Sequence, residues 1–489
     1  MSRHEGSTTA RPSVTIIGAG PNGLAAAALL AREGARPRLF EAHDTIGGGL
    51  RSAEVTRPGF VHDLCASVLP LAVGSPFLSG LPLADHGLAW VHPGAPLAHP
   101  LDGGSAVMLE RDLDATAAGL GPDGPAYRAL VEPLAEAWPA LAEEVLGPVA
   151  HLPRHPWALA RFGMRAPWPA RFLAERAFTG PRARALFAGL AAHGMIPLGA
   201  PASSAIGLVL AATGHAVGWP FVRGGAQKLA DALAAEVRAH GGEIVTGHRV
   251  DDVDAVAEGS VVLFDLTPRE LLRVAGPRFS GGYRRALERY RYGPGTFKID
   301  YALSGPIPWA ADACRRAGTV HLGGTLEEIA AAEAAVARGE MPERPFVLLA
   351  QPTLFDPTRA PEGRHVAWAY AHVPAGSDVD ASDRIEAQIE RFAPGFRERV
   401  LARHTRNAVE TEAYDPNFVG GDVNGGLLSL RQIVARPAWR ADPYGTSDPD
   451  LFVGSAATPP GGGVHGMAGY HAARSVLRRL RAQGAFPGA

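Results

Sequence analysis

Gly18-Ala19-Gly20-Pro21-Asn22-Gly23 is the stretch that decides the fold of this 489-residue chain. It follows Val14-Thr15-Ile16-Ile17, an apolar run that predicts a buried parallel strand. It precedes Leu24 to Leu30, which predicts a helix that stops at Gly34. In such a unit the first glycine permits the tight turn, the second lets the backbone approach a pyrophosphate, and the third lets the helix lie close to the strand. Because the helix N-terminus presents free N–H groups to phosphate oxygens, the sequence predicts a dinucleotide site here.

A second glycine-rich turn near the C-terminus extends this prediction. Leu451 to Ser455 predicts a strand, and Pro459-Pro460-Gly461-Gly462-Gly463-Val464-His465-Gly466 leads from it into a helix that starts near Met467. At the first turn, Arg38 to Glu41 predicts a second strand whose carboxylate lies within about 20 residues of the glycines, where a ribose hydroxyl is held. Two such turns at opposite ends of the chain indicate both ends of one long cofactor, and flavin adenine dinucleotide (FAD) is the candidate.

Composition narrows the remaining classes of protein. The length predicts two or three domains, and the net charge of −2 argues against a nucleic-acid partner. Cys65 and Cys314 are far apart and form neither a CxxC pair nor a metal spacing, so we expect no metal site and a reducing cytoplasm. We expect residues 1–12 to be a disordered leader, and no apolar stretch approaches the length of a transmembrane helix.

The predicted elements are distributed as a discontinuous pair of domains. After the first dinucleotide unit, residues 86–220 form helices interrupted by proline and tryptophan, such as Trp157 to Phe178. A helix from Ala226 to His240 and a strand at Glu243 to Thr246 then indicate a return to the first sheet. We therefore assign residues 13–85, 221–280 and 441–489 to a cofactor-binding domain, and 86–220 and 281–440 to a substrate domain.

Four motifs carry a resemblance to a known family. They are Phe221-Val222-Arg223-Gly224-Gly225, Leu354-Phe355-Asp356-Pro357-Thr358-Arg359-Ala360-Pro361-Glu362-Gly363, Gly420-Gly421-Asp422-Val423-Asn424-Gly425-Gly426 and the final Pro459 to Gly466 turn. Their order resembles the phytoene desaturase-like FAD-dependent oxidoreductases over nearly the whole chain. It is most similar to the subgroup of pyridine nucleotide-disulphide oxidoreductase domain-containing protein 2 and its bacterial relatives. The resemblance implies an α/β fold: a Rossmann-like FAD-binding domain of amine-oxidase type with a discontinuous substrate domain of mixed sheet plus helices.

The resemblance also implies which residues meet the cofactor. The implied set is Gly18, Gly20, Pro21, Asn22, Gly23, Glu41, Ala42, Gly48, Gly49, Arg51, Val250, Gly454, Ser455, Gly462, Val464 and His465. Gly49 stands where amine-oxidase relatives have an arginine, so Arg51 is either a phosphate contact or a solvated arginine. Ser455 replaces a frequent aspartate, and Val464 and His465 would lie against the isoalloxazine. Because this segment holds no cysteine, we expect noncovalent FAD.

Two residues are candidates for catalysis. Lys298, in Gly295-Thr296-Phe297-Lys298-Ile299-Asp300-Tyr301, resembles the flavin-facing lysine of monoamine oxidases, and burial would lower its pKa for proton transfer. The alternative is a lysine paired with Asp300 or solvent. His465 would donate to the flavin edge or move a proton, or it is a packing histidine. His193 and His215, with Trp368 and Tyr370, are either cavity wall or core.

These observations predict an FAD-dependent dehydrogenase or desaturase that removes hydride from a C–C or C–N bond of a mostly apolar small molecule, with oxygen or a quinone as the electron acceptor. A redox-neutral flavin isomerase, an amine oxidase and a noncatalytic flavin-binding protein remain as alternatives. Pro153 to Arg184 alternates arginine with aromatic residues, so this segment either contacts a membrane peripherally or is a helical cap over the substrate domain.

Overall fold

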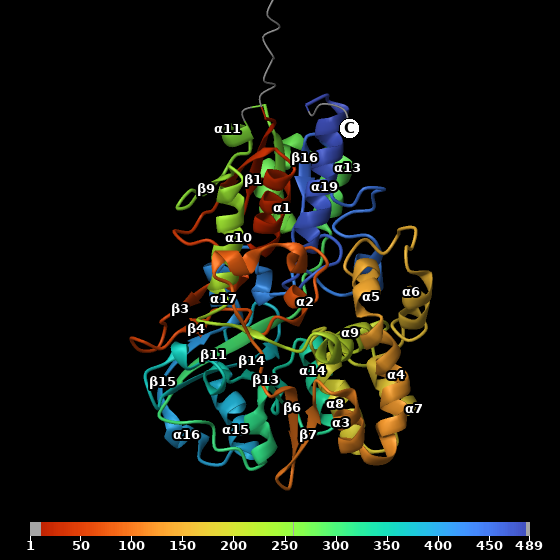
Figure 1. Cartoon of the computed structure of the whole chain (residues 1–489), viewed down its shortest axis with the longest axis vertical. Helices are drawn as coiled ribbons and strands as arrows, with labels where there is room; N and C mark the ends of the chain where they lie inside the picture. The colour runs from red at the N-terminus through yellow and green to blue at the C-terminus, as the bar shows by residue number, and fades with distance from the viewer. Residues whose placement is uncertain (1–10, 258, 486–489) are drawn as a thin grey trace, which may run out of the picture.

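Two sheets, each with its own helices, organise the molecule (Figure 1). The computed structural model describes residues 11–257 and 259–485. Residues 1–10, which make up most of the predicted leader, therefore lie outside the described part of the chain. In Figure 1 the smaller sheet lies in the upper half, and the larger sheet lies below it with a group of helices beside it.

The smaller sheet is parallel and contains five strands in the order β16-β10-β1-β2-β9. The strands are β1 (Ser13–Ile17), β2 (Arg36–Phe40), β9 (Glu243–Val245), β10 (Val261–Phe264) and β16 (Leu451–Val453). All five come from the three segments that the sequence assigns to the cofactor-binding domain. Because parallel strands bury both faces, β10 consists of buried apolar residues, and every residue of β1 after Ser13 is buried.

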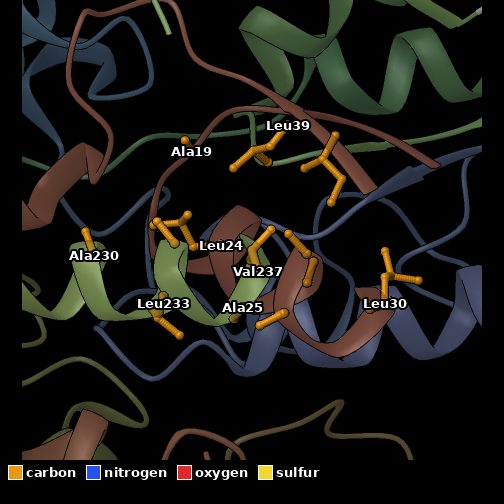
Figure 2. Packing of buried hydrophobic residues seen from close by; sticks show 14 of the residues in the cluster. Ala19, Leu24, Ala25, Leu30, Leu39, Ala230, Leu233 and Val237 are labelled. Atoms are coloured by element: carbon orange, nitrogen blue, oxygen red, sulfur yellow. The ribbon is translucent and has the colours of Figure 1, made fainter. Parts of the chain in front are cut away.

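Helices cover both faces of this sheet. On one face, α1 (Pro21–Arg32) lies beside α10 (Gln227–Ala239), and Leu24 and Ala25 belong to the same apolar cluster as Leu233 (Figure 2). The C-terminal helix α19 (Met467–Ala482) packs on α1 from the other side. On the opposite face lie α12 (Pro268–Ala275) and α13 (Gly281–Glu288), although α13 begins the segment that the sequence assigns to the substrate domain.

The larger sheet is mixed and follows the order β15-β11-β14-β13-β12-β6-β7. Its strands are β6 (Ala95–Leu101), β7 (Ser105–Leu109), β11 (Gly295–Leu303), β12 (Ala317–Leu322), β13 (Val347–Ala350), β14 (His365–Val373) and β15 (Val400–Arg406). One face packs on α15 (Ser382–Phe392). The other face packs on the helical group, which contains α3 (Leu113–Gly119), α4 (Gly124–Glu136), α5 (Trp138–Val145), α6 (Pro156–Gly163), α7 (Ala170–Ala177), α8 (Pro181–Ala192), α9 (Ser203–Ala216) and α14 (Leu326–Ala337).

Short elements complete the chain. They are β3 (Ser52–Ala53), β4 (His62–Asp63), α2 (Pro70–Val73), β5 (Trp90–Val91), β8 (Phe221–Val222), α11 (Asp254–Ala257), α16 (Phe396–Arg399), α17 (Ala408–Tyr414) and α18 (Leu430–Val434). Within the described ranges, every helix is too short or too polar to cross a membrane.

A buried ion network ties the two domains together. The Arg359 guanidinium donates to Asp63 (2.6 Å), to Asp356 (3.1 Å) and to the carbonyl of Val222 (2.7 Å). The same Asp356 carboxylate accepts the Gly224 N–H at 2.7 Å. Two of the four motifs that carry the family resemblance therefore meet at this junction. Asp356 and Arg359 of one motif bind the backbone of the other, at Gly224 and Val222.

Candidate active site

A cavity of about 460 Å³ is lined by residues of both domains. Its volume lies within the range of small-molecule sites. At one end lie the first glycine turn and Glu41, and at the other lie Lys298, Trp368 and His193. The cavity therefore joins the predicted nucleotide site to the sheet of the substrate domain.

The nucleotide end is built where β1 and β2 stop. Gly18, Gly20, Pro21 and Asn22 line the cavity, and so do Glu41, Ala42 and Val250. The Glu41 carboxylate is buried and accepts the N–H groups of Ala19 and His43, each at 3.0 Å. Gly23 does not line the cavity, because it lies against the Gly18 carbonyl, which is the close helix–strand packing that the motif predicts.

The second glycine loop lies directly on the first. A Cβ on Gly48 would lie 3.1 Å from the Cα of Gly20, so a larger residue would push the two loops apart. Arg51 follows this loop, is buried and lines the cavity. Its Nη2 lies 3.8 Å from Glu41 Oε1, and its Nε has no hydrogen-bond partner in the described part of the chain. Of the two interpretations of Arg51, the solvated arginine is therefore wrong.

The C-terminal glycine turn forms a further part of the wall. Gly462 and Val464 line the cavity together with Asn424, whose carbonyl oxygen lies 2.7 Å from the position of a Cβ on Gly462. Ser455 also lines it, but its hydroxyl donates to the carbonyl of Leu266 at 2.8 Å. Gly454 lies behind the wall, against Ala472 of α19.

His465 does not line the cavity, although the sequence suggests that it faces the cofactor. Its Nδ1 accepts the N–H of Met467 at 3.0 Å, and its carbonyl accepts the Ser75 hydroxyl at 2.7 Å. Burial lowers the pKa of His465 to about 4, so the imidazole is neutral near pH 7. This geometry makes the ring a support of the glycine turn, and a catalytic role for His465 stays a prediction.

Lys298 lies in the middle of β11 and faces the cavity together with Thr296. It is buried, forms an ion pair with Asp300 and lies 5.7 Å from the centroid of the Trp368 ring. Burial lowers the pKa of the Lys298 ammonium, and the adjacent Asp300 carboxylate offsets this only in part. Both sequence interpretations of Lys298 are thus combined: the side chain faces the cavity and is paired with Asp300.

The structure adds site residues that the sequence analysis did not propose. Asp265 follows β10 directly, lines the cavity and accepts the Gly23 N–H at 2.8 Å, so it caps α1 from another strand. Burial raises the pKa of Asp265 to about 7. Arg406 of β15 lies beside Lys298 in the sheet and lines the cavity as well. The usable signal for Asp265 was its place at the carboxyl end of a parallel strand, where ligands bind in such sheets.

The substrate-domain wall is mostly apolar. Leu348 and the stacked pair Trp368 and Tyr370, with ring centroids 5.5 Å apart, line it together with His193. These residues are therefore cavity wall, as one of the two sequence interpretations holds. His215 lies elsewhere, with its Nε2 2.9 Å from the Tyr127 hydroxyl.

Comparisons with known proteins agree with this architecture. Residues 16–77 match the family model of the NAD(P)-binding Rossmann-like domain. The chain is 27% identical over 556 residues to pyridine nucleotide-disulfide oxidoreductase domain-containing protein 2 of Rattus norvegicus, covering 95% of this chain and 93% of that protein. It is 25% identical over 279 residues to a neurosporene-forming phytoene desaturase of Rhodobacter capsulatus, covering 51% of each chain.

Solved structures share the fold at low sequence identity. An oxidoreductase from Methanosarcina mazei superposes with a TM-score of 0.64 at 17% identity, covering 95% of this chain and 100% of that one. Cyclohexylamine oxidase from Brevibacterium oxydans gives a TM-score of 0.59 at 16% identity, covering 96% and 100%. The predicted resemblance and the predicted α/β class, with a Rossmann-like domain and amine-oxidase-like architecture, are confirmed.

Proposed function

We propose that the protein is an FAD-dependent oxidoreductase that removes hydride from a C–C or C–N bond of a mostly apolar small molecule. The observation that carries this proposal is the continuity of one cavity from the glycine turn and Glu41 to Lys298 and the apolar wall. Oxygen or a quinone is the proposed electron acceptor. The oxidoreductase relatives and the oxidase neighbour support the reaction class.

The residues at the nucleotide end fit the parts of FAD. The buried Glu41 carboxylate suits a ribose hydroxyl. Because Gly20 and Gly48 have no side chains, the backbones of both loops can approach a diphosphate. Two buried polar atoms there, Arg51 Nε and Asn22 Oδ1, lack a partner in the described residues, and a dinucleotide would satisfy them. Gly462 and Val464 then form the surface for the flavin ring. We propose noncovalent binding, because residues 454–469 contain no cysteine.

When bound, the flavin supplies the two-electron chemistry. The residues of this chain orient the substrate, exclude water from the cavity and provide a proton site. Trp368, Tyr370 and Leu348 hold an apolar substrate and exclude water from the wall of the large sheet. Lys298 lines the cavity and holds a proton at Nζ, paired with Asp300, which is buried and does not line the cavity. We propose that Lys298 moves or positions a proton during hydride removal.

The anaerobic visible spectrum of the purified protein tests this proposal. We expect a flavin band that bleaches when the substrate is added from a panel of polyenes, fatty-acyl compounds and amines. A band that shifts without bleaching would contradict net oxidation and favour the isomerase alternative. A protein that shows no band, even after added FAD, would refute the cofactor.

A matched pair of glycine variants locates the cofactor. Gly20→Ala places a methyl group 2.6 Å from Asp265 Oδ2 and in the path of the diphosphate, so it should lose flavin. Gly282→Ala adds the same group in open space on α13 and should retain flavin. Equal flavin content in the two variants would place the cofactor away from the first glycine turn.

A further inference from the structure

A pair of histidines closes the apolar end of the cavity. His193 follows α8 and lines the cavity, whereas His321 lies in β12 and is fully buried. Their Nε2 atoms are 2.9 Å apart, so one ring donates a hydrogen bond to the other. Burial lowers the pKa of His193 to about 3, with a smaller effect from His372, so the pair is neutral.

The surroundings of the pair decide which ring donates. The other ring nitrogen of His321, Nδ1, is buried without a hydrogen-bond partner in the described part of the chain. An unsatisfied buried N–H is rarer in proteins than an unsatisfied acceptor. His321 therefore carries its proton on Nε2 and donates it to His193 Nε2. It follows that His193 carries its own proton on Nδ1.

That Nδ1–H is available to a ligand. His193 as a residue is only partly buried, and it lines the cavity. Within residues 11–257 and 259–485, His193 Nδ1 has no hydrogen-bond partner. It is also not one of the fully buried polar atoms that lack a partner. His193 thus presents a neutral donor to the cavity.

Charge on the adjoining sheet points to the same kind of ligand. Among the described cavity-lining residues on the strands of the large sheet, the charged side chains are Lys298 and Arg406, and no carboxylate is present. The Arg406 guanidinium lies 4.1 Å from the centroid of the Tyr414 ring and forms no ion pair in the described residues. Because Asp300 compensates the charge of Lys298, Arg406 leaves the uncompensated positive charge on this sheet, and it would repel an ammonium group.

We propose that the substrate is a neutral or anionic lipophilic molecule whose oxygen accepts the His193 Nδ1–H, and that the wall disfavours molecules with an ammonium group. This inference rests on the proposed function and names the substrate class of that site.

Calorimetric titration of the FAD-loaded full-length protein tests the inference with three probes of equal chain length: 2-decanone, decanoate and decylamine. We expect the ketone and the carboxylate to bind at least about tenfold more tightly than the amine. The amine would lack the hydrogen bond from His193 and would be repelled by the positive charge of the wall. His193→Phe keeps a flat ring without the donor and should weaken ketone binding about five- to tenfold, while amine binding stays unchanged.

Two further variants separate binding from structure. His193→Gln keeps a donor and should restore most of the ketone affinity. His215→Phe removes a histidine outside the cavity and should change nothing. Amine binding as tight as ketone binding, an unchanged His193→Phe variant, an equal loss in His215→Phe, or no binding of any probe would each overturn the inference.

The outcomes for the two proposals are distinguishable. The flavin band, read before titration, reports on the cofactor alone. Probe preference and its dependence on His193 are read as heat and require no turnover. A protein without flavin would defeat the proposed function even if it preferred the ketone. A flavoprotein that preferred the amine would defeat only the inference made here from His193 and the cationic wall.

Discussion

At the scale of single residues, Lys298 is the side chain whose chemistry can be isolated most cleanly. Lys298→Met should lower the rate of flavin reduction about 100-fold or more, since positioned acid–base groups contribute this much. The variant also leaves Asp300 buried without its partner, which lowers stability. Lys298→Met combined with Asp300→Asn should regain the melting temperature and stay slow, and stopped-flow reduction with the identified substrate measures this.

The chain offers a matched control for Lys298. Lys228 is the other lysine in the sequence, and it is exposed on α10. Lys228→Met should reduce flavin at the wild-type rate. A double variant at Lys298 and Asp300 that reduced flavin equally fast would end the assignment of a proton role to Lys298.

Asp265 makes a prediction about pH. Burial raises its native pKa to about 7, although the Gly23 N–H opposes this, whereas an unfolded aspartate titrates near pH ~3.9. The stability that its protonated form contributes is therefore complete below about pH 4 and is lost as pH rises through about 7. Asp265→Asn should unfold at higher urea than wild type at pH 8, with the difference vanishing at pH 4. These measurements use FAD-stripped protein.

The same substitution reports on diphosphate binding. Asp265 Oδ2 lies beside Gly20 at the start of α1, where an ionised carboxylate would repel phosphate oxygens. Wild-type FAD affinity should therefore fall above pH ~7, and that of Asp265→Asn should stay level, as followed by flavin fluorescence. Parallel pH profiles for the two proteins would show that Asp265 stays neutral in the complex or lies outside the phosphate site.

At the scale of elements, the segment that spans α6 and α7 has two distinct faces. Ala158, Leu173 and Ala174 pack on the core of the substrate domain, as the cap interpretation expects. Leu152, which precedes α6, is 91% exposed, Trp157 in α6 is 82% exposed, and Arg161 and Arg165 are exposed as well. Exposed apolar side chains among arginines suit an anionic membrane surface, so we propose peripheral contact here.

Vesicle sedimentation tests the membrane contact. We expect wild-type protein to sediment with vesicles that contain phosphatidylserine, and the Leu152→Ser, Trp157→Ser double variant to lose most of this binding. Trp439 is 78% exposed in a different segment, so Trp439→Ser is a matched control that should bind like wild type. Equal binding of the double variant and the control would leave this segment as a cap alone.

Local pattern was sufficient for most elements, including helices that proline interrupts. The sequence predicts a helix from Ala226 to His240, and the structure has α10 at Gln227–Ala239, because Gly241 adopts the positive φ of 87° that ends a helix. Trp157 to Phe178 is divided into α6 and α7, as expected for helices interrupted by proline. Pro169 lacks an N–H to continue a helix, so α7 starts afresh after it.

At the scale of the whole molecule, the site divides into a part that one motif encodes and a part that assembly creates. Gly20, Glu41 and Gly48 could be predicted, since each acts within a short stretch of chain. Arg406 could not be assigned in advance, because its role depends on which strands meet across the cavity, whereas the place of Asp265 after a parallel strand was a usable signal that the sequence analysis did not take up. Likewise, no local sequence signal predicts that the His465 ring does not line the cavity and instead accepts the Met467 N–H.

The junction between domains is likewise a product of assembly, and it governs acid stability. Arg359 is fully buried between Asp63 and Asp356, which lie in different domains. Although burial raises the pKa of both carboxyls, Arg359 and hydrogen bonds to each hold the pKa values below their usual range. The stability they contribute is therefore present above about pH 4 and is lost as pH falls through their native values.

Removing Arg359 tests this account of the junction. Arg359→Met leaves two buried carboxylates unpaired and should cost roughly 3–5 kcal/mol at pH 7. The exposed Arg364, whose Nη1 reaches only the Ser304 carbonyl, supplies the control Arg364→Met, which should unfold near the wild-type urea midpoint. Because protonation neutralises the stranded carboxyls, the deficit of Arg359→Met should shrink as pH approaches ~3. A stability deficit that stayed constant with pH would mean that Arg359 acts by filling space. Equal urea midpoints for the two variants at pH 7 would show that the Arg359 ion network does not stabilise the contact between the domains.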